Sequence, residues 1–171
     1  SIFGILSITA LSGIGPILSQ AVSRGMEGSL FLALKAKIKW GLIGSLASIG
    51  ISTYYYINGA LILAFAFLIA SIFIPFMNAL NIYQDYLLGK KKFKDSSISY
   101  SLSQLLAVLI VILTLFLTKN LFVIFIIYLS SWTLIRLFFF IRTIKKYPPN
   151  NRIDPATISY GKQSSFIDFL A

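Results

Sequence analysis

The amino-acid sequence predicts an all-α fold, a bundle of helices that crosses a membrane. Composition, apolar stretches and the placement of charge all indicate it. The 171-residue chain is 57% hydrophobic and 12% charged, whereas soluble domains carry about 25% charged residues. A stretch of about 20 apolar residues, at ~1.5 Å rise per residue, matches a hydrocarbon core of about 30 Å. We expect five such spans, at about residues 2–22, 40–56, 60–88, 98–118 and 121–141.

Lysine and arginine fall almost entirely on one side of these spans. Thirteen of the 15 basic residues follow the first, third and fifth spans, whereas only Lys119 lies in the other loops and Arg136 lies inside the fifth span. Because the basic loops of membrane proteins stay cytoplasmic, we expect the Lys/Arg-rich loops to face the cytoplasm. Topology therefore explains the net charge of +10, and we expect no binding to nucleic acid.

Both ends of the sequence suggest that it is part of a longer, transporter-like protein. The chain begins inside the first apolar stretch, and residues 164–171 resemble the truncated start of a further membrane segment. With the basic loops inside, the first residue is expected outside, so we expect one more helix before it. Residues 1–144 are expected to form a transmembrane lobe, followed by a cytoplasmic connector at 145–163, which we interpret as a plain linker.

Cysteine and histidine are both absent from the chain. Disulfides and thiolate metal sites are thereby excluded, and the commonest proton shuttle and metal ligand are missing. The one Gly-Lys pair, Gly161-Lys162, lacks the neighbours of a phosphate-binding loop. The sequence therefore predicts no enzyme, no cofactor and no metal site, and it favours transport.

Proline and glycine interrupt two of the predicted spans. Gly15 and Pro16 lie in the first span, and Pro75 lies near the middle of the third. Proline removes a backbone donor, and the carbonyl that it frees needs another partner in lipid. Gly15, Pro16 and Pro75 are therefore hinge candidates, with a static kink as the alternative. Asp154-Pro155, in the connector, resembles the start of a short helix.

Small residues recur every four positions in the second span, at Gly44, Ser48 and Ser52. Such a ridge permits two helices to approach closely, so we expect packing there and no chemistry. The preceding segment, residues 30–39, is basic and amphipathic. It is expected to be a charged cytoplasmic flank, or alternatively a helix that lies in the membrane interface.

Polar residues share one face on several spans, all in the cytoplasmic halves, and predict a polar cavity that opens inward. Ionisable residues inside a membrane tend to face the bundle interior. The candidates for substrate binding are Gln20, Arg24, Asn78, Asn81, Gln104 and Arg136. The candidates for an ion site or charge pair are Asp85 and Glu27, and Asp85 is expected at a depth that allows pairing with Arg136. Alternatively, Asp85 and Arg136 reach the lipid headgroups.

Several segments together are similar to a known family. They are Ser12–Gly28, Lys35–Leu42, Asn81–Gln84, Gly89–Phe93, Lys145–Asn151 and Ile158–Lys162, and the most specific is the turn Ser23-Arg24-Gly25-x-Glu27-Gly28. The chain resembles the bacterial polysaccharide-biosynthesis flippases, the Wzx-like (O-antigen) oligosaccharide transporters of the multidrug/oligosaccharidyl-lipid/polysaccharide exporter superfamily. The resemblance covers nearly the whole chain.

The resemblance implies the N-terminal lobe of a MATE-like transporter in the bacterial cytoplasmic membrane, facing a second six-helix lobe of the same chain. It also implies the substrate, an undecaprenyl-pyrophosphate-linked oligosaccharide that is moved to the periplasmic leaflet. Arg24 and Arg136 are then expected to bind phosphate, while Gln20, Asn78, Asn81 and Gln104 hydrogen-bond the sugars.

Two other functions remain open at this point. A multidrug or cation antiporter of the same superfamily would place buried carboxylates in its cavity, and Asp85 is the only acidic residue within a predicted span. A non-transporting membrane scaffold subunit would instead bury its polar stripes in contacts between helices.

The predicted topology is tested by cysteines placed at Asn58 and Lys91 of the complete protein. An impermeant thiol reagent is expected to label the two positions from opposite sides of the membrane, because one span, the third, separates Asn58 from the basic loop at Lys91. Labelling of both positions from the same compartment would contradict the topology.

Overall fold

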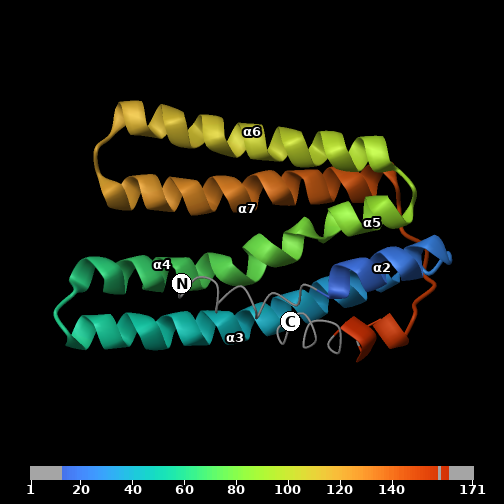
Figure 1. Ribbon diagram of the computed structural model, residues 1–171, viewed down its shortest axis with the longest axis horizontal. Helices are drawn as coiled ribbons and strands as arrows, with labels where there is room; N and C mark the ends of the chain where they lie inside the picture. The colour runs from blue at the N-terminus through green and yellow to red at the C-terminus, as the bar shows by residue number, and fades with distance from the viewer. Residues whose placement is uncertain (1–12, 158, 162–171) are drawn as a thin grey trace.

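The computed structural model describes residues 13–157 and 159–161, and these residues form helices and turns without any strand (Figure 1). Its elements are α2 (Ile14–Ser23), α3 (Ser29–Ile57), α4 (Leu61–Ala79), the 3-10 helix η1 (Leu80–Ile82), α5 (Tyr83–Gly89), α6 (Phe93–Leu117) and α7 (Leu121–Lys146). The predicted all-α class is thereby confirmed for the described residues. Most of the first predicted span and the segment 164–171 lie outside them.

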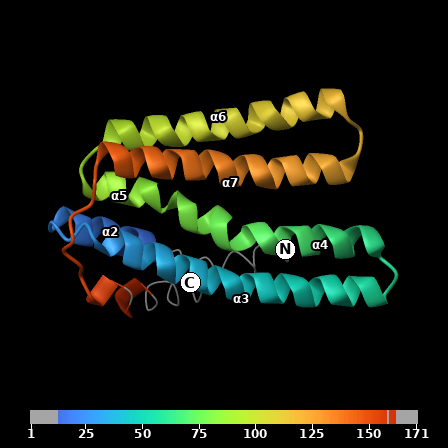
Figure 2. The ribbon, with the colours of Figure 1, turned by 180° about the vertical axis from the view of Figure 1, so that it is seen from behind.

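Two antiparallel hairpins form the body of the molecule. α3 packs along α4, and α6 packs along α7, as the views from both sides show (Figures 1 and 2). The chain passes from the first hairpin to the second through η1 and α5, and α2 packs on α5. The buried core lies at this crossing and includes Ile14, Leu18, Leu30, Tyr83, Tyr86 and Phe139.

Three helical segments among the described residues are long and apolar enough to cross a membrane: Leu61–Gly89, which joins α4, η1 and α5, then α6 and α7. They agree with the third, fourth and fifth predicted spans. α3 is long enough, with 29 residues, but its glycines, serines and tyrosines dilute its apolar character. The second span, and the total of five, therefore stay predictions.

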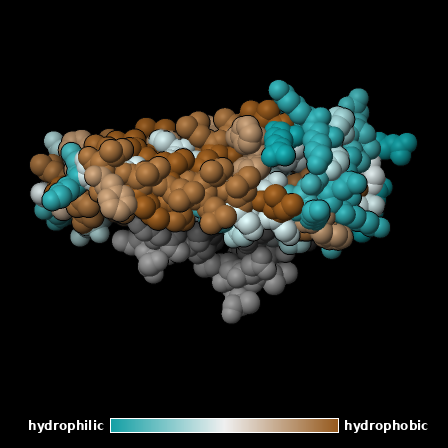
Figure 3. Space-filling model, turned by 90° about the horizontal axis from the view of Figure 1, so that it is seen from above, coloured by the Kyte–Doolittle hydropathy of each residue, from teal (hydrophilic) through white to brown (hydrophobic). Residues whose placement is uncertain are grey.

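The turns between helices gather at two ends of the molecule. The α3–α4 and α6–α7 turns lie at one end, and the α2–α3 and α5–α6 turns lie at the other (Figure 1). The latter end carries Arg24 and the lysines of the α5–α6 turn, and it is the more hydrophilic end, whereas hydrophobic residues cover the middle (Figure 3). The basic loops therefore meet in space as expected, and the compartment that they face stays a prediction.

Several helices extend beyond the predicted spans. α3 begins at Ser29, so the basic segment 30–39 is helical and continuous with the second predicted span. α6 begins at Phe93, and α7 continues to Lys146. Leu, Ala and Lys favour helix irrespective of their hydropathy. An apolar stretch therefore marks the thickness of the membrane, whereas the helix itself ends where a breaking residue or a cap stops it.

Serine hydroxyls join α3 to α4. Ser48 donates to the carbonyl of Phe67 at 2.8 Å, Ser52 donates to that of Ala64 at 2.7 Å, and Ser45 makes a third such bond. All three serines are buried. The close approach predicted from the small residues of the second span is confirmed, and it forms a row of hydrogen bonds that we call the serine seam.

Pro75 explains the position of Ser45 in the serine seam. Proline has no backbone N–H, so the carbonyl four residues earlier, that of Ser71, loses its helical donor. Ser45 Oγ donates to this carbonyl at 2.5 Å. Gly41 allows the approach, because a Cβ atom there would lie only 2.6 Å from Pro75 Cα. A neighbouring helix thus satisfies the group that proline freed, as a membrane interior requires.

The break in the third predicted span lies beyond its proline. Pro75 is inside α4, and the helix changes to 3-10 geometry only at Leu80–Ile82. Pro16 lies in the first turn of α2, where a proline is tolerated because that N–H has no helical partner. Pro16 therefore fits the helix without a break, the irregular backbone near Pro75 is η1, and the hinge role of Gly15, Pro16 and Pro75 stays a prediction.

The connector after α7 is fastened to the turn between α2 and α3, so it is not a plain linker. Asn150 Nδ2 donates to the Gly25 carbonyl at 2.8 Å, and Asn150 Oδ1 accepts from Glu27 N at 3.1 Å. Gly28 N donates to the Arg152 carbonyl at 2.9 Å. These bonds join segments more than 120 residues apart in the sequence and hold the basic end of the molecule together.

The expected helix start in the connector is also present. Asp154 Oδ1 accepts a hydrogen bond from Ala156 N at 3.0 Å, and residues 156–157 and 159–161 are helical. A side-chain oxygen that accepts from the N–H two residues later is the usual cap of a helix N-terminus.

The serine seam is tested by Ser45→Ala, with Ser48→Ala as the matched control. Ser45→Ala is expected to lower the free energy of unfolding by about 1–2 kcal/mol, because the Ser71 carbonyl then has no donor, whereas Ser48→Ala costs only about 0.6 kcal/mol. The measurement is reversible unfolding of the complete protein in mixed micelles of rising dodecyl sulfate content.

The same assay on Pro75→Ala gives the internal check. The alanine restores an N–H to the Ser71 carbonyl, so Ser45→Ala should cost less in that background. An equal cost in both backgrounds would contradict the link between the proline and the serine.

Candidate functional site

The residues predicted to bind substrate lie in different environments. Gln20 and Arg24 are exposed on α2 and in the turn after it, whereas Asn78, Asn81 and Gln104 are partly buried on α4, η1 and α6. Asn81 Oδ1 is buried and has no hydrogen-bond partner among the described residues. A buried acceptor without a donor costs about 1–3 kcal/mol. Within the predicted set, Asn81 is therefore the side chain with a buried acceptor that has no partner among the described residues.

Arg136 joins α7 to the end of α4. Its Nη1 donates to the backbone carbonyl of Met77, just before η1. The guanidinium carbon also lies 4.6 Å from the ring centroid of Trp132. Trp132 precedes Arg136 by one turn, so the guanidinium points away from the lysine-rich end of α7. The alternative that Arg136 reaches the headgroups at that end is therefore wrong.

Asp85 faces α2 and α3 instead of Arg136. A Cβ atom at Gly15 would lie 2.6 Å from a carboxylate oxygen of Asp85, so glycine permits the contact between α2 and α5. Lys37 of α3 is the basic group that attracts the Asp85 carboxylate. No ion pair joins Asp85 to Arg136 in the described part of the chain. The predicted pairing was wrong because Asp85 packs against Gly15 of α2 whereas Arg136 donates to the Met77 carbonyl of α4.

Two other charged side chains lie within electrostatic range of Lys37. Lys37 interacts electrostatically with both Asp85 and Arg136, and all three are partly buried. We call Lys37, Asp85 and Arg136 the central charge cluster. It draws on α3, α5 and α7 and carries two basic groups and one acidic group. The cluster therefore has one positive charge in excess. Charges inside a membrane are costly and are usually paired, so this excess charge is unusual.

Sequence reasoning missed Lys37 because it was grouped with the other lysines of a basic flank. A signal was present, however. Lys35 and Lys39 lie four residues apart on one face of a helix, and Lys37, between them, points to the opposite face. In the structure Lys35 and Lys39 are exposed and Lys37 is partly buried.

Glu27 forms a charge pair at the basic end, as the sequence suggested. Its carboxylate lies 2.8 Å from Lys90 Nζ, and Glu27 Oε2 also accepts from Asn150 N at 3.2 Å. The pair joins the α2–α3 turn to the start of the α5–α6 turn. Its position beside the connector indicates a structural role.

The predicted inward cavity stays a prediction. One apolar pocket lies between α4, α6 and α7, and two others lie along α7 near Arg142 and Lys146. None of the three is lined by Asn78, Asn81, Gln104 or Arg136. No group of three or more acidic, cysteine or histidine side chains that suits a metal ion occurs among the described residues.

Comparison of the chain with protein-family models, with curated proteins and with solved structures found no match. The central charge cluster and the resemblance of the sequence segments are therefore the basis for assigning a function.

The central charge cluster is tested by Asp85→Asn. The variant removes the negative charge that attracts Lys37, so the free energy of unfolding is expected to fall by about 1–2 kcal/mol, less than for a broken buried ion pair because the two groups do not form one. Combining it with Lys37→Gln should restore most of the loss. The assay is the dodecyl sulfate titration described above.

Asp95→Asn is the matched control. Asp95 pairs with Lys146 at 2.8 Å at the surface, and an exposed pair contributes little. If the double variant of Lys37 and Asp85 were as unstable as Asp85→Asn alone, the pairing would be refuted.

Proposed function

We propose that the chain is part of a membrane transporter that moves an anionic lipid-linked oligosaccharide, of the undecaprenyl-pyrophosphate type, from the cytoplasmic to the periplasmic leaflet. The observation that carries the proposal is the central charge cluster, in which Lys37 and Arg136 outnumber Asp85. An unbalanced positive charge inside a membrane protein is costly unless an anion joins it. A pyrophosphate meets that requirement.

The side chains offer suitable chemistry for such a substrate. A guanidinium has five N–H donors in a planar fork that matches phosphate oxygens, and the contact of Arg136 with Met77 uses one of its nitrogens. Asn81 adds an unused acceptor for a hydroxyl group. In this proposal Arg136 and Lys37 bind phosphate, while Asn78, Asn81 and Gln104 bind sugar.

The proposal needs groups beyond the described residues. The partners are the bilayer, the lipid-linked substrate and a second lobe of the same chain, which would close a cavity over these side chains. The setting is the bacterial cytoplasmic membrane with the basic loops in the cytoplasm. No enzymatic step, cofactor or nucleic acid enters the proposal.

A membrane scaffold or assembly subunit is the second candidate, and one observation favours it. The serine seam and the bond from Arg136 to Met77 use polar groups for contacts between helices. Such use is what a non-transporting subunit would require. A cation antiporter is less favoured, because the carboxylate of Asp85 already lies beside Lys37.

Export of glycan separates these functions. In cells that depend on the complete protein for surface glycan, Arg136→Ala is expected to lower export at least tenfold per folded molecule, beyond any loss of stability from the missing bond to Met77. Arg136→Lys should be intermediate, because it keeps the charge and loses the fork. Arg24→Ala is expected to reduce export less, since Arg24 is exposed.

Arg142→Ala is the control, because Arg142 is an exposed arginine on the same helix. Wild-type export by Arg136→Ala would remove this residue from the mechanism. Loss of export only in parallel with loss of folded protein would favour the scaffold.

A further inference from the structure

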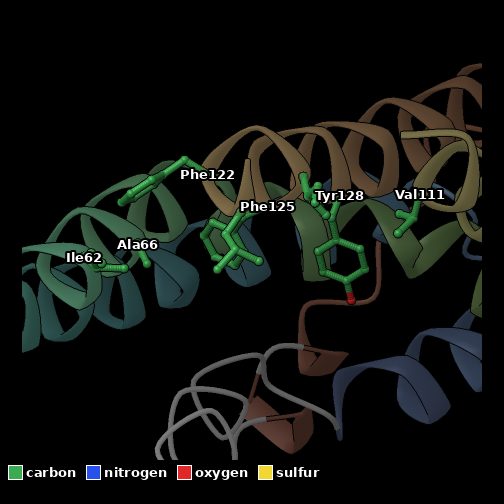
Figure 4. Close-up of a pocket in the computed structure, with 8 residues that line it drawn as sticks. Ile62, Ala66, Val111, Phe122, Phe125 and Tyr128 are labelled. Atoms are coloured by element: carbon green, nitrogen blue, oxygen red, sulfur yellow. The ribbon is translucent and has the colours of Figure 1, made fainter. Parts of the chain in front are cut away.

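An apolar groove lies between the two hairpins, in the half of the molecule away from the central charge cluster. It has a volume of about 370 Å³ and is lined by Ile62 and Ala66 of α4, Val111 of α6, and Leu121, Phe122, Ile124, Phe125 and Tyr128 of α7. Figure 4 shows side chains from the two hairpins around it. The Tyr128 hydroxyl is the only side-chain polar group in this lining. A cavity lined in this way stays dry and takes apolar ligands.

The size of the groove suits a single hydrocarbon chain. From Leu121 to Tyr128 the groove follows α7 for about 10 Å. A hydrocarbon chain is narrow, and the groove volume of about 370 Å³ lies at the small end of the range of small-molecule sites, which begins at about 300 Å³. The groove therefore suits a chain of methylenes.

The position of the groove indicates which molecule supplies the chain. Its walls belong to the three segments whose composition allows them to cross a membrane, so hydrocarbon is the surrounding solvent. Leu121, beside the α6–α7 turn, lies at one end of the groove, and Tyr128 lies at the other. The hydrocarbon part of one leaflet is about 15 Å thick, which is half of a 30 Å core. The groove length of about 10 Å is two thirds of this thickness.

A positive charge lies near the Leu121 end of the groove. Lys119 precedes Leu121 by two residues, is exposed, and is the only lysine or arginine in the turns at this end of the molecule. A phosphate at Lys119 would leave the attached acyl chain aligned with the groove. Charge and apolar surface are thus arranged in the order in which a phospholipid presents them.

We propose that this groove binds one acyl chain of a bilayer phospholipid of the leaflet on the Lys119 side, with the lipid phosphate at Lys119. The site is separate from the central charge cluster and does not depend on the proposed transport function. The lipid fills the space between the hairpins where α4 and α7 leave a gap in their packing, and it thereby completes the contact between them.

The test uses the complete protein in phosphatidylglycerol vesicles that contain a small share of the same lipid with a photoactivatable diazirine on one acyl chain. After irradiation, the labelled peptides are mapped by mass spectrometry. The expected result is labelling concentrated on residues 62–66 and 121–128. Ala66→Phe and Val111→Phe fill the groove from two different helices and should each reduce this labelling at least fivefold, and Lys119→Gln should reduce it less.

Ala47→Phe is the matched control, because Ala47 is an exposed alanine on α3 that does not line the groove. Its labelling should equal that of the wild type, and gel filtration confirms that each variant is folded. The proposal is overturned if labelling is spread evenly over the exposed faces of α4, α6 and α7. It is also overturned if both folded filling variants are labelled like the wild type, or if the groove peptides carry no label, as a protein segment seated in the groove would cause.

Discussion

A backbone carbonyl inside a bilayer must find its donor within the protein, because the hydrocarbon offers none. The arrangement of the first hairpin follows from this constraint. Pro75 frees the carbonyl of Ser71, and Ser45 supplies the missing donor from the neighbouring helix. The contact fixes α3 and α4 in one register, and Gly41 permits the short distance that it needs. The other hydroxyls of the serine seam then meet their carbonyls in the same register.

The end of α4 meets the same constraint in a second way. Just before the chain changes from α to 3-10 geometry, the Met77 carbonyl accepts from Arg136, so a charged side chain of the second hairpin binds the first. The change at η1 leads into α5, which packs on α2 as well as on α6 and α7. Asp85 thereby comes to lie against Gly15 and beside Lys37. The central charge cluster is thus a consequence of how the backbone crosses from one hairpin to the other.

The same contacts relate the two candidate functions to each other. Arg136 stabilises the contact between the hairpins whatever the protein transports, and its remaining N–H groups are what a phosphate would bind. Polar groups that are consumed by packing favour a scaffold, whereas the unbalanced charge beside Asn81 favours an anionic ligand. The apolar groove lies at the opposite end of the α4–α7 contact, where no hydrogen bond joins the hairpins among the described residues. A hydrocarbon chain suits this space because it needs no hydrogen-bond partner.

The sequence by itself determined the helical class, the three apolar segments that are long enough to span a membrane, the separation of basic loops from the others, and the close approach at the serines. These properties follow from local composition and period, which each segment carries alone. The tertiary structure decided the partner of Arg136, the role of Lys37 and the fastening of the connector by Asn150. These contacts depend on the direction in which each helix presents its side chains and on the position at which its backbone changes geometry. Both are determined only when segments far apart in the sequence pack together.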